Sequence, residues 1–148
     1  MPVLVDTNVL VYSRDTADPT KHASASEWMR HLWETGEGRL SIQVLQEYYV
    51  TTTRKLQPGL PTDVARADID DLSAWRPVVI DTNGLGVAWS IEDRFGLSFW
   101  DSLIVAAAHI AACDVLLTED LQHGADLDGV RIVDPFRVSA ADHRGRES

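Results

Sequence analysis

The feature that most constrains the fold of this chain is a short apolar run near its start that ends in polar residues. Residues 3–5 (Val-Leu-Val) are followed directly by Asp6, Thr7 and Asn8. An apolar run bounded by turn-forming residues is typical of a strand that is buried on both faces. The carboxyl ends of strands in an open parallel sheet form the edge where ligands bind. The run therefore makes Asp6 a candidate ligand-binding residue, although a local side-chain turn explains the same pattern.

The size and composition of the chain fit one compact domain. Its 148 residues are 45% hydrophobic, which is enough to bury roughly two thirds of the unfolded surface. We expect a single domain over residues 1–139 and a polar tail, residues 140–148, that is disordered. The formal net charge is −10, which would repel a phosphate backbone. A nucleic acid would therefore need a local basic patch or a metal ion, and the excess of acids also suits a divalent cation or a basic protein partner.

The single cysteine and the apolar segments point to a reducing compartment and no membrane. Cys113 is the only cysteine, so no internal disulfide is possible, and its apolar neighbours predict a buried, unreactive thiol. The first residues lack the basic region of a signal peptide. The longest apolar tract, residues 103–113, is too short to span a bilayer. We therefore expect a cytoplasmic protein.

Three helices are predicted in the first half of the chain. The first can begin at Pro19 or Thr20, and Gly36 and Gly38 end it. Its apolar stripe at helical spacing consists of Ala25, Trp28, Met29, Leu32 and Trp33. A second helix is predicted over residues 43–56, where Glu47 lies off the apolar face, so that the pattern alone indicates a solvated side chain. A third is predicted from about residue 62 to residue 75, before Pro77.

A second apolar run competes with the first for the role of the functional strand. Residues 78–80 (Val-Val-Ile) precede Asp81, Thr82 and Asn83, which repeats the opening pattern. Asp81 or Thr82 can simply cap a helix that ends near Phe95, and the glycines at 84 and 86 are too few for a phosphate-binding loop. We therefore favour the opening run.

Acidic residues also follow the later elements. The most apolar helix is predicted from Ser98 to about residue 112, and Ser98 with Asp101 forms a pair similar to a capping box, which alone can explain this acid. The next predicted strand, residues 114–118, ends at Glu119 and Asp120. Acids from strand ends and from helices are therefore available to converge at one edge of a sheet.

With these motifs in this order, the chain resembles the PIN domain family, and within it the VapC-type toxins of bacterial toxin–antitoxin pairs. The resemblance covers almost the whole chain, and residues 130–136 are similar to the family's closing strand. It implies an α/β fold with three α/β/α layers and a mostly parallel central sheet. The residues that carry it are Asp6-Thr7-Asn8, Glu47 within residues 44–49, Asp101 within residues 98–104, and Asp120 within residues 117–124.

The resemblance implies a metal-dependent endoribonuclease. Hydrolysis of an RNA phosphodiester needs an activated water and neutralisation of charge at phosphorus, and oxygen-ligated Mg²⁺ or Mn²⁺ supplies both. Mutual repulsion should raise at least one carboxyl pKa above about 4. The catalytic, metal-binding acids implied by the resemblance are Asp6, Glu47, Asp101 and Asp120, with Asp6 and Asp101 as direct ligands.

Other parts of the implied site remain open. Thr7 or Asn8 would orient the substrate or a metal-bound water, and Glu119 is the alternative to Asp120 as the fourth acid. The expected partners are RNA, a cognate antitoxin and a second copy of the chain in a homodimer. Contacts to RNA could come from four basic residues that are otherwise ordinary solubilising charges, namely Arg14, Lys21, Arg54 and Lys55.

Two other functions compete with this interpretation. One is a non-catalytic PIN-like module that binds RNA or protein. The other is a phosphotransferase that uses Asp6 as a covalent nucleophile, but such enzymes need a second Asp two residues later, where this chain has Asn8. The sequence contains no phosphate-binding loop with Lys, no His-Glu-x-x-His zinc pair and no Gly-x-Ser-x-Gly elbow.

Overall fold

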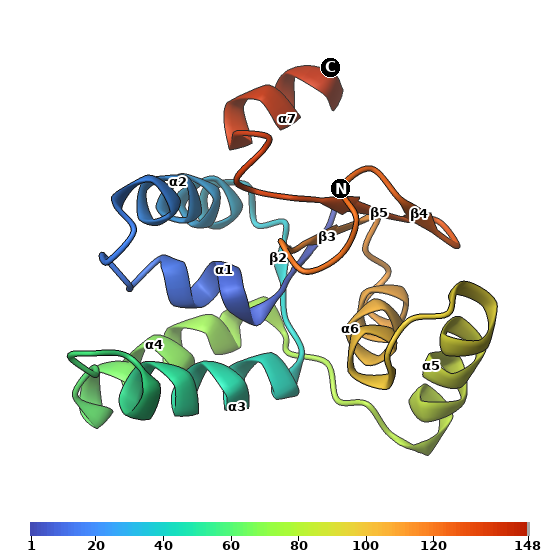
Figure 1. Cartoon of the computed structure of the whole chain (residues 1–148), viewed down its shortest axis with the longest axis horizontal. Helices are drawn as coiled ribbons and strands as arrows, with labels where there is room; N and C mark the ends of the chain where they lie inside the picture. The colour runs from blue at the N-terminus through green and yellow to red at the C-terminus, as the bar shows by residue number, and fades with distance from the viewer. Residues whose placement is uncertain (148) are drawn as a thin grey trace.

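The computed structural model describes residues 1–147, and Ser148 lies outside the described part (Figure 1). Its strands are β1 (Val3–Val5), β2 (Gly38–Arg39), β3 (Val115–Leu117), β4 (Asp126–Leu127) and β5 (Val130–Val133). Within residues 1–147 they form a five-stranded sheet in the order β2-β1-β3-β5-β4. All neighbours are parallel except β4 and β5. The predicted α/β class with a mostly parallel sheet is therefore confirmed.

The helices begin and end at residues that suit these positions. Asp18 accepts a hydrogen bond from the backbone N–H of Lys21 and Pro19 opens the second helix, while Gly36 ends it in the left-handed region with φ of 70°. Short π-helical and 3₁₀ segments, Thr51–Lys55 and Ser73–Trp75, extend two of the helices. The α-helices are α1 (Thr7–Tyr12), α2 (Pro19–Thr35), α3 (Ile42–Val50), α4 (Thr62–Leu72), α5 (Thr82–Phe95), α6 (Phe99–Ile110) and α7 (Ala140–Glu147).

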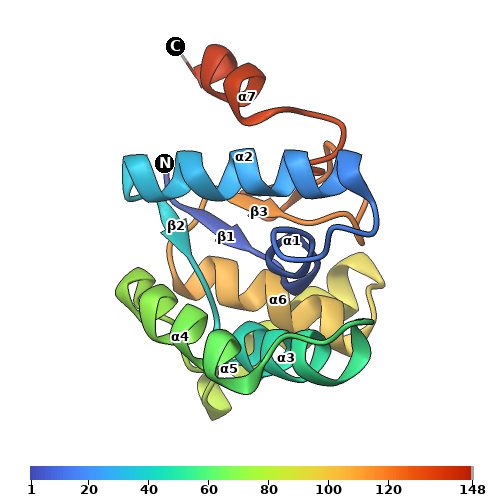
Figure 2. The same ribbon diagram turned by 90° about the vertical axis from the view of Figure 1, so that its left-hand side faces the viewer.

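Two hydrophobic cores cover the two faces of the sheet. Successive strand residues point to opposite faces, so Val3 and Val5 pack with residues of α1, α2 and α3. Leu4 lies between them in the sequence and packs instead with residues of α5 and α6. Figure 2 shows α2 on one side of β1 and β3, with α6 on the other. This two-sided burial fixes β1, and therefore the position where Asp6 leaves the sheet.

Two stretches differ from the sequence predictions. Residues 140–147, predicted to be disordered, form α7, because Val138 and Ala140 are buried and His143 lies against Trp28, with 5.2 Å between the ring centroids. Residues 78–80 form no strand beyond one bridge between Val78 and residue 41. As expected, Asp81 caps α5.

Two further expectations concern the membrane and the thiol. No helix within residues 1–147 is long and apolar enough to cross a membrane. Cys113 is buried, and burial raises the pKa of its thiol to about 12. The thiol is therefore protonated at neutral pH, as predicted for an unreactive cysteine.

Candidate active site

Asp6 lies where β1 ends and α1 begins, at the carboxyl edge of the sheet. Its Oδ1 accepts a hydrogen bond from the backbone N–H of Thr7 at 2.7 Å, and its Oδ2 accepts one from Thr118 Oγ1 at 2.8 Å. Thr118 follows β3, which is paired with β1 in the sheet. The parallel pairing thus brings together two residues that are 112 positions apart.

Glu47 projects from α3 toward the start of α1. Thr7 Oγ1 donates to Glu47 Oε2 at 2.8 Å, and Gln43 Nε2, one turn earlier on α3, donates to Oε1 at 2.9 Å. Glu47 is exposed, as its helical position predicted. Its carboxylate is nevertheless held beside the residue that follows Asp6.

Asp120 is held by the side chain of Asn8 and by the strand end. Asn8 Nδ2 donates to Asp120 Oδ2 at 3.0 Å and lies 3.4 Å from Thr118 Oγ1, which also accepts from the backbone N–H of Asp120 at 3.1 Å. A hydroxyl has one proton and can accept twice. Thr118 is fully buried, and its hydroxyl therefore donates to Asp6 and accepts from Asn8 Nδ2 and from the backbone N–H of Asp120.

Thr118 was not among the residues predicted from the sequence. Its position between a buried strand and two acids, equivalent to that of Asp6 after β1, is the signal that could have identified it. Its neighbour Glu119 turns away from this group, because Lys21 Nζ forms an ion pair with Glu119 Oε2 at 2.7 Å. The structure thus places Asp120, and not Glu119, beside Asn8.

Asp101 lies in the first turn of α6. Its backbone N–H donates to Ser98 Oγ at 3.1 Å, so half of the predicted capping pair is present. The carboxylate of Asp101 forms no hydrogen bond or ion pair with any residue of the described chain. The residue before it, Trp100, lines a hollow of about 530 Å³ together with Glu47. The structure therefore brings Asp6, Glu47 and Asp120 into one hydrogen-bond network, and the carboxylate of Asp101 is not part of it.

The environment of Asp6 changes its acidity. Burial raises the pKa of Asp6 to about 6, and the charges of Asp120 and Glu47 add to the increase. Hydrogen bonds from Thr118 and Thr7 act in the opposite direction. One carboxyl thus has a raised pKa, as predicted, but the main cause is burial rather than the expected mutual repulsion.

The donor atoms at this edge of the sheet suit a hard cation. Among residues 1–147, no Lys or Arg pairs with Asp6, Glu47 or Asp120, and Oδ1 of Asn8 is buried without a hydrogen-bond donor. Carboxylate and amide oxygens are the ligands that Mg²⁺ and Mn²⁺ prefer, and a buried acceptor without a donor is a place where a water or an ion binds. In the described chain, no three acidic, His or Cys side chains already stand close enough to hold a metal ion. The chemistry of the donors fits, and metal binding would require the carboxylates to move together.

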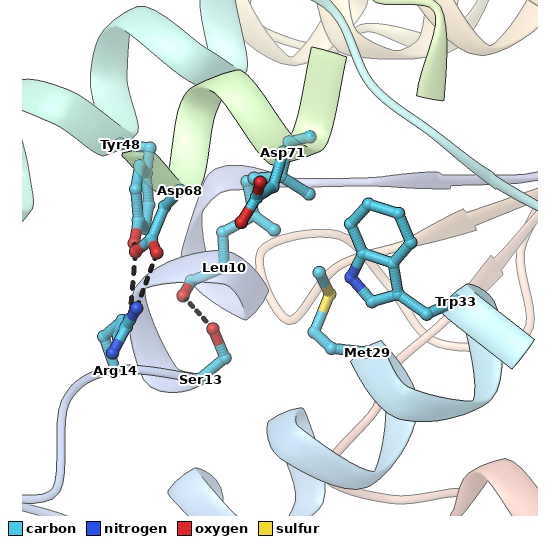
Figure 3. Close-up of a pocket in the computed structure, with 9 residues that line it drawn as sticks. Leu10, Ser13, Arg14, Met29, Trp33, Tyr48, Asp68 and Asp71 are labelled. Atoms are coloured by element: carbon cyan, nitrogen blue, oxygen red, sulfur yellow. Dashed lines mark hydrogen bonds and ion pairs between the residues drawn. The ribbon is translucent and has the colours of Figure 1, made fainter. Parts of the chain in front are cut away.

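A separate pocket of about 220 Å³ lies among α1, α2, α3 and α4 (Figure 3). Arg14 Nε donates to Asp68 Oδ2 at 2.9 Å, and the hydroxyl of Tyr48 donates to the same oxygen. Burial and the nearby Asp68 raise the pKa of Tyr48, so the phenol stays protonated. This network ties α4 to the end of α1, and Arg14 is engaged in it.

Of the four basic residues considered for RNA, Arg14 and Lys21 are thus paired with acids. Arg54 and Lys55 have no ion pair within the described residues.

Comparisons with known proteins agree with this architecture. The family model of the PIN domain matches residues 3–125. The fold is similar to that of a chain in a toxin–antitoxin complex from Klebsiella pneumoniae, with a TM-score of 0.61 and 17% identity over 90% of this chain and 97% of that chain. It is also similar to VapC20 of Mycobacterium tuberculosis, a toxin that cleaves the sarcin–ricin loop, with a TM-score of 0.59 and 22% identity over 77% of this chain and 86% of that chain.

A third similar structure is a chain of the DNA-bound VapBC complex from Salmonella typhimurium, with a TM-score of 0.61 and 18% identity over 91% of this chain and 98% of that chain. A search of curated proteins finds no match to the sequence. At these identities the solved structures establish a shared fold and no more. The family model spans most of the sequence, including the ends of β1 and β3, and the chain therefore belongs to the PIN domain family.

Proposed function

We propose that this chain is a metal-dependent endoribonuclease of the VapC type, the toxin of a toxin–antitoxin pair. The observation that carries the proposal is the network of three carboxylates, those of Asp6, Glu47 and Asp120, at the carboxyl edge of a PIN-type sheet. No Lys or Arg within the described residues pairs with any of the three. Two of the similar solved structures are complexes of such pairs, a toxin–antitoxin complex and VapBC, and the third is VapC20, a toxin that cleaves the sarcin–ricin loop.

The acids of this edge would hold Mg²⁺ or Mn²⁺. Asp6 and Asp120 are joined through Thr118 and Asn8, and Glu47 is held from the side of α1. Asp101 would complete the set from the start of α6, where its backbone N–H, and not its carboxylate, is hydrogen-bonded to Ser98 within the described residues. When bound, the metal ion neutralises charge on the phosphodiester and lowers the pKa of a bound water.

Thr7 and Asn8 act in this proposal mainly by positioning. The hydroxyl of Thr7 and the amide N–H of Asn8 each donate to a carboxylate oxygen, which sets the directions of Glu47 and Asp120. Oδ1 of Asn8 remains available to orient a water. Side chains whose rotamers are fixed in this way limit the reorganisation needed when substrate binds.

A basic partner segment suits the same edge. The chain has a net charge of −10, and no Lys or Arg of residues 1–147 pairs with Asp6, Glu47 or Asp120. Arg or Lys side chains of an antitoxin could therefore neutralise these three carboxylates and block metal and substrate together. If charge reversal of every basic residue in the inhibitory segment left inhibition unchanged, this mode of neutralisation would be wrong.

Cleavage of RNA by the purified protein tests the proposal. Total bacterial RNA is incubated with wild type and with Asp6→Asn, in Mg²⁺, in Mn²⁺ and in EDTA. We expect discrete fragments only with wild type and a divalent metal. The matched control is Asp81→Asn, which changes an acid in the same Asp-Thr-Asn context but at the N-cap of α5. Fragments that appear equally in EDTA or with Asp6→Asn would refute the metal mechanism, and no fragments under any condition would favour a non-catalytic module.

A further inference from the structure

Two hollows lie on either side of Glu47 on the surface of α3. The first, which we call the Trp100 hollow, has a volume of about 530 Å³ and extends from Gln43 to Trp100 at the start of α6. The second, the Lys55 hollow, has a volume of about 440 Å³ and extends from Thr7 to Lys55. Gln46 and Glu47 line both hollows. They therefore form one trough that crosses α3, with Glu47 of the candidate active site at its centre.

An exposed indole forms one end of this trough. Trp100 is 65% exposed, although it is the residue directly before Asp101 in a well-packed helix. Its ring meets Phe99 edge to face, with 5.3 Å between centroids and an interplanar angle of 71°, and this contact restrains the indole without covering it. A large aromatic surface exposed at the rim of a candidate site marks a place where a flat ligand group binds.

The π-helical segment after α3 provides the other end. The backbone N–H of Leu56 donates to the carbonyl of Thr51 at 3.1 Å, five residues earlier, and the hydroxyls of Thr52 and Thr53 donate to carbonyls one turn back. A π-helical turn holds more residues than an α-helical turn, so each residue rotates the chain less. Lys55 thus stays on the side of Glu47, eight residues before it, where a continuous α-helix would carry it further around. Both residues line the Lys55 hollow.

Lys55 is an unusual residue to find at this position. The chain carries ten more negative than positive charges, yet this exposed lysine lies in the same hollow as Glu47 and forms no ion pair with any residue of the described chain. Gln46, between the two hollows, also has no hydrogen-bond partner in residues 1–147 for its side-chain amide. Beside aliphatic side chains such as those of Ile42, Val79 and Val50, the trough therefore offers an aromatic face, an amide and a cation in that order.

We propose that a single strand of RNA lies across α3 in this trough. One nucleobase stacks on the indole of Trp100, and a backbone phosphate further along the strand contacts Lys55. The phosphodiester between them lies over Glu47. This inference rests on the proposed function and adds the residues that hold the substrate on either side of the bond that is cut.

The chemistry of the trough favours RNA over a peptide segment. Nucleobases stack on exposed aromatic rings regardless of sequence, and phosphates pair with isolated lysines even in an acidic protein. The continuity of both hollows with Glu47 places the strand where the candidate acids act. In a duplex the bases are stacked on one another and cannot reach Trp100, so the trough should select unpaired RNA.

Binding of short oligoadenylate in EDTA, measured by fluorescence anisotropy, tests the inference without cleavage. We expect Trp100→Ala to raise the Kd by roughly 5- to 150-fold, the range for loss of one base–aromatic stack, while Trp100→Phe keeps most of the affinity. Trp89→Ala is the matched control, because Trp89 is 53% exposed on α5 and lines neither hollow. Lys55→Gln should reduce the slope of log Kd against log salt by about 0.7. A fully paired duplex should bind more weakly than the single strand.

Cleavage in Mg²⁺ by the same proteins separates the two proposals. If wild type cleaves RNA but Trp100→Ala binds and cleaves as wild type does, the trough is wrong while the proposed function stands. If oligoadenylate binding depends on Trp100 and Lys55 but no variant cleaves, the trough stands and catalysis is wrong. A wild type that binds no single strand would overturn the trough. The trough would also be wrong if Trp100→Ala bound oligoadenylate as wild type does and lost only the binding of a co-purified protein partner.

Discussion

Replacement of Asp6 by Asn in the metal-free protein should raise the stability relative to wild type more at neutral pH than at acidic pH. Burial raises the pKa of Asp6 from 3.8 to about 6, so between these pH values the native state binds more protons than the unfolded chain. The free energy of unfolding contributed by this carboxyl therefore falls as pH rises from about 4 to about 6. Asn carries no titrating proton, and the variant should lack this fall.

The size of the effect follows from the pKa. Each unit of difference between the folded and unfolded pKa changes the free energy of unfolding by about 1.36 kcal/mol, so the increase from 3.8 to about 6 corresponds to roughly 3 kcal/mol. Asp6 is only partly buried, so we expect roughly 2–3 kcal/mol. The hydrogen bonds from Thr7 and Thr118 are altered in the variant at every pH. Their cost therefore cancels when the same pair of proteins is compared at two pH values.

Urea unfolding of wild type and Asp6→Asn in EDTA, at about pH 4 and pH 7.5, measures this difference. The stability of the variant relative to wild type should increase by roughly 2–3 kcal/mol between the two pH values. Asp81→Asn, which alters a helix cap, should show no such change. A relative stability of Asp6→Asn that is the same at both pH values would refute the assignment of a raised pKa to Asp6.

Three further predictions concern the same edge of the sheet and its support. Asp101→Asn should abolish RNA cleavage, while the melting temperature of the variant stays within a few degrees of that of wild type. The variant keeps the hydrogen bond from the backbone N–H of residue 101 to Ser98 and loses only a helix-dipole contact of about 0.3–1 kcal/mol. Cleavage at the wild-type rate would leave Asp101 as a capping residue alone. Thr118→Val should destabilise the protein by roughly 1–3 kcal/mol in urea and raise the pKa of Asp6 further, because it removes a buried hydroxyl that donates to Asp6; an unchanged urea midpoint would argue against this network. Gly38→Ala should lower the melting temperature, because its Cβ would lie 2.5 Å from ring atoms of Trp75; an unchanged melting temperature would mean that the indole moves aside.

The strand ends could be predicted because their signals are local. An apolar run that stops at Asp6 is visible in a few residues, and a mostly parallel sheet follows from the alternation of helices and strands. The helix starts at Asp18 and Asp81 were likewise predictable from capping chemistry. These parts of the fold depend on residues that are neighbours in the sequence.

The hydrogen-bond network could not be predicted because it depends on tertiary packing. Thr118 reaches Asp6 only because β1 and β3 are adjacent. The helical pattern around Glu47 indicates only a solvated side chain, so the contact of Glu47 with Thr7 is not visible in it, and only the family resemblance implies a role for this acid. The tail was predicted to be disordered from its polar composition. Its helix instead packs on Trp28, whose N–H donates to the carbonyl of residue 138, 110 positions away.

Binding of Mn²⁺ to the metal-free protein tests the central claim most directly, because the claim is that these carboxylates together hold a divalent cation. Calorimetric titration of Mn²⁺ at pH 7.5 should show saturable binding to wild type and to Asp81→Asn. The same titration of Asp6→Asn should show binding weakened by at least about tenfold, since an amide is a poor substitute for a charged oxygen ligand. Equal affinity in all three proteins, or no binding to wild type, would contradict the account.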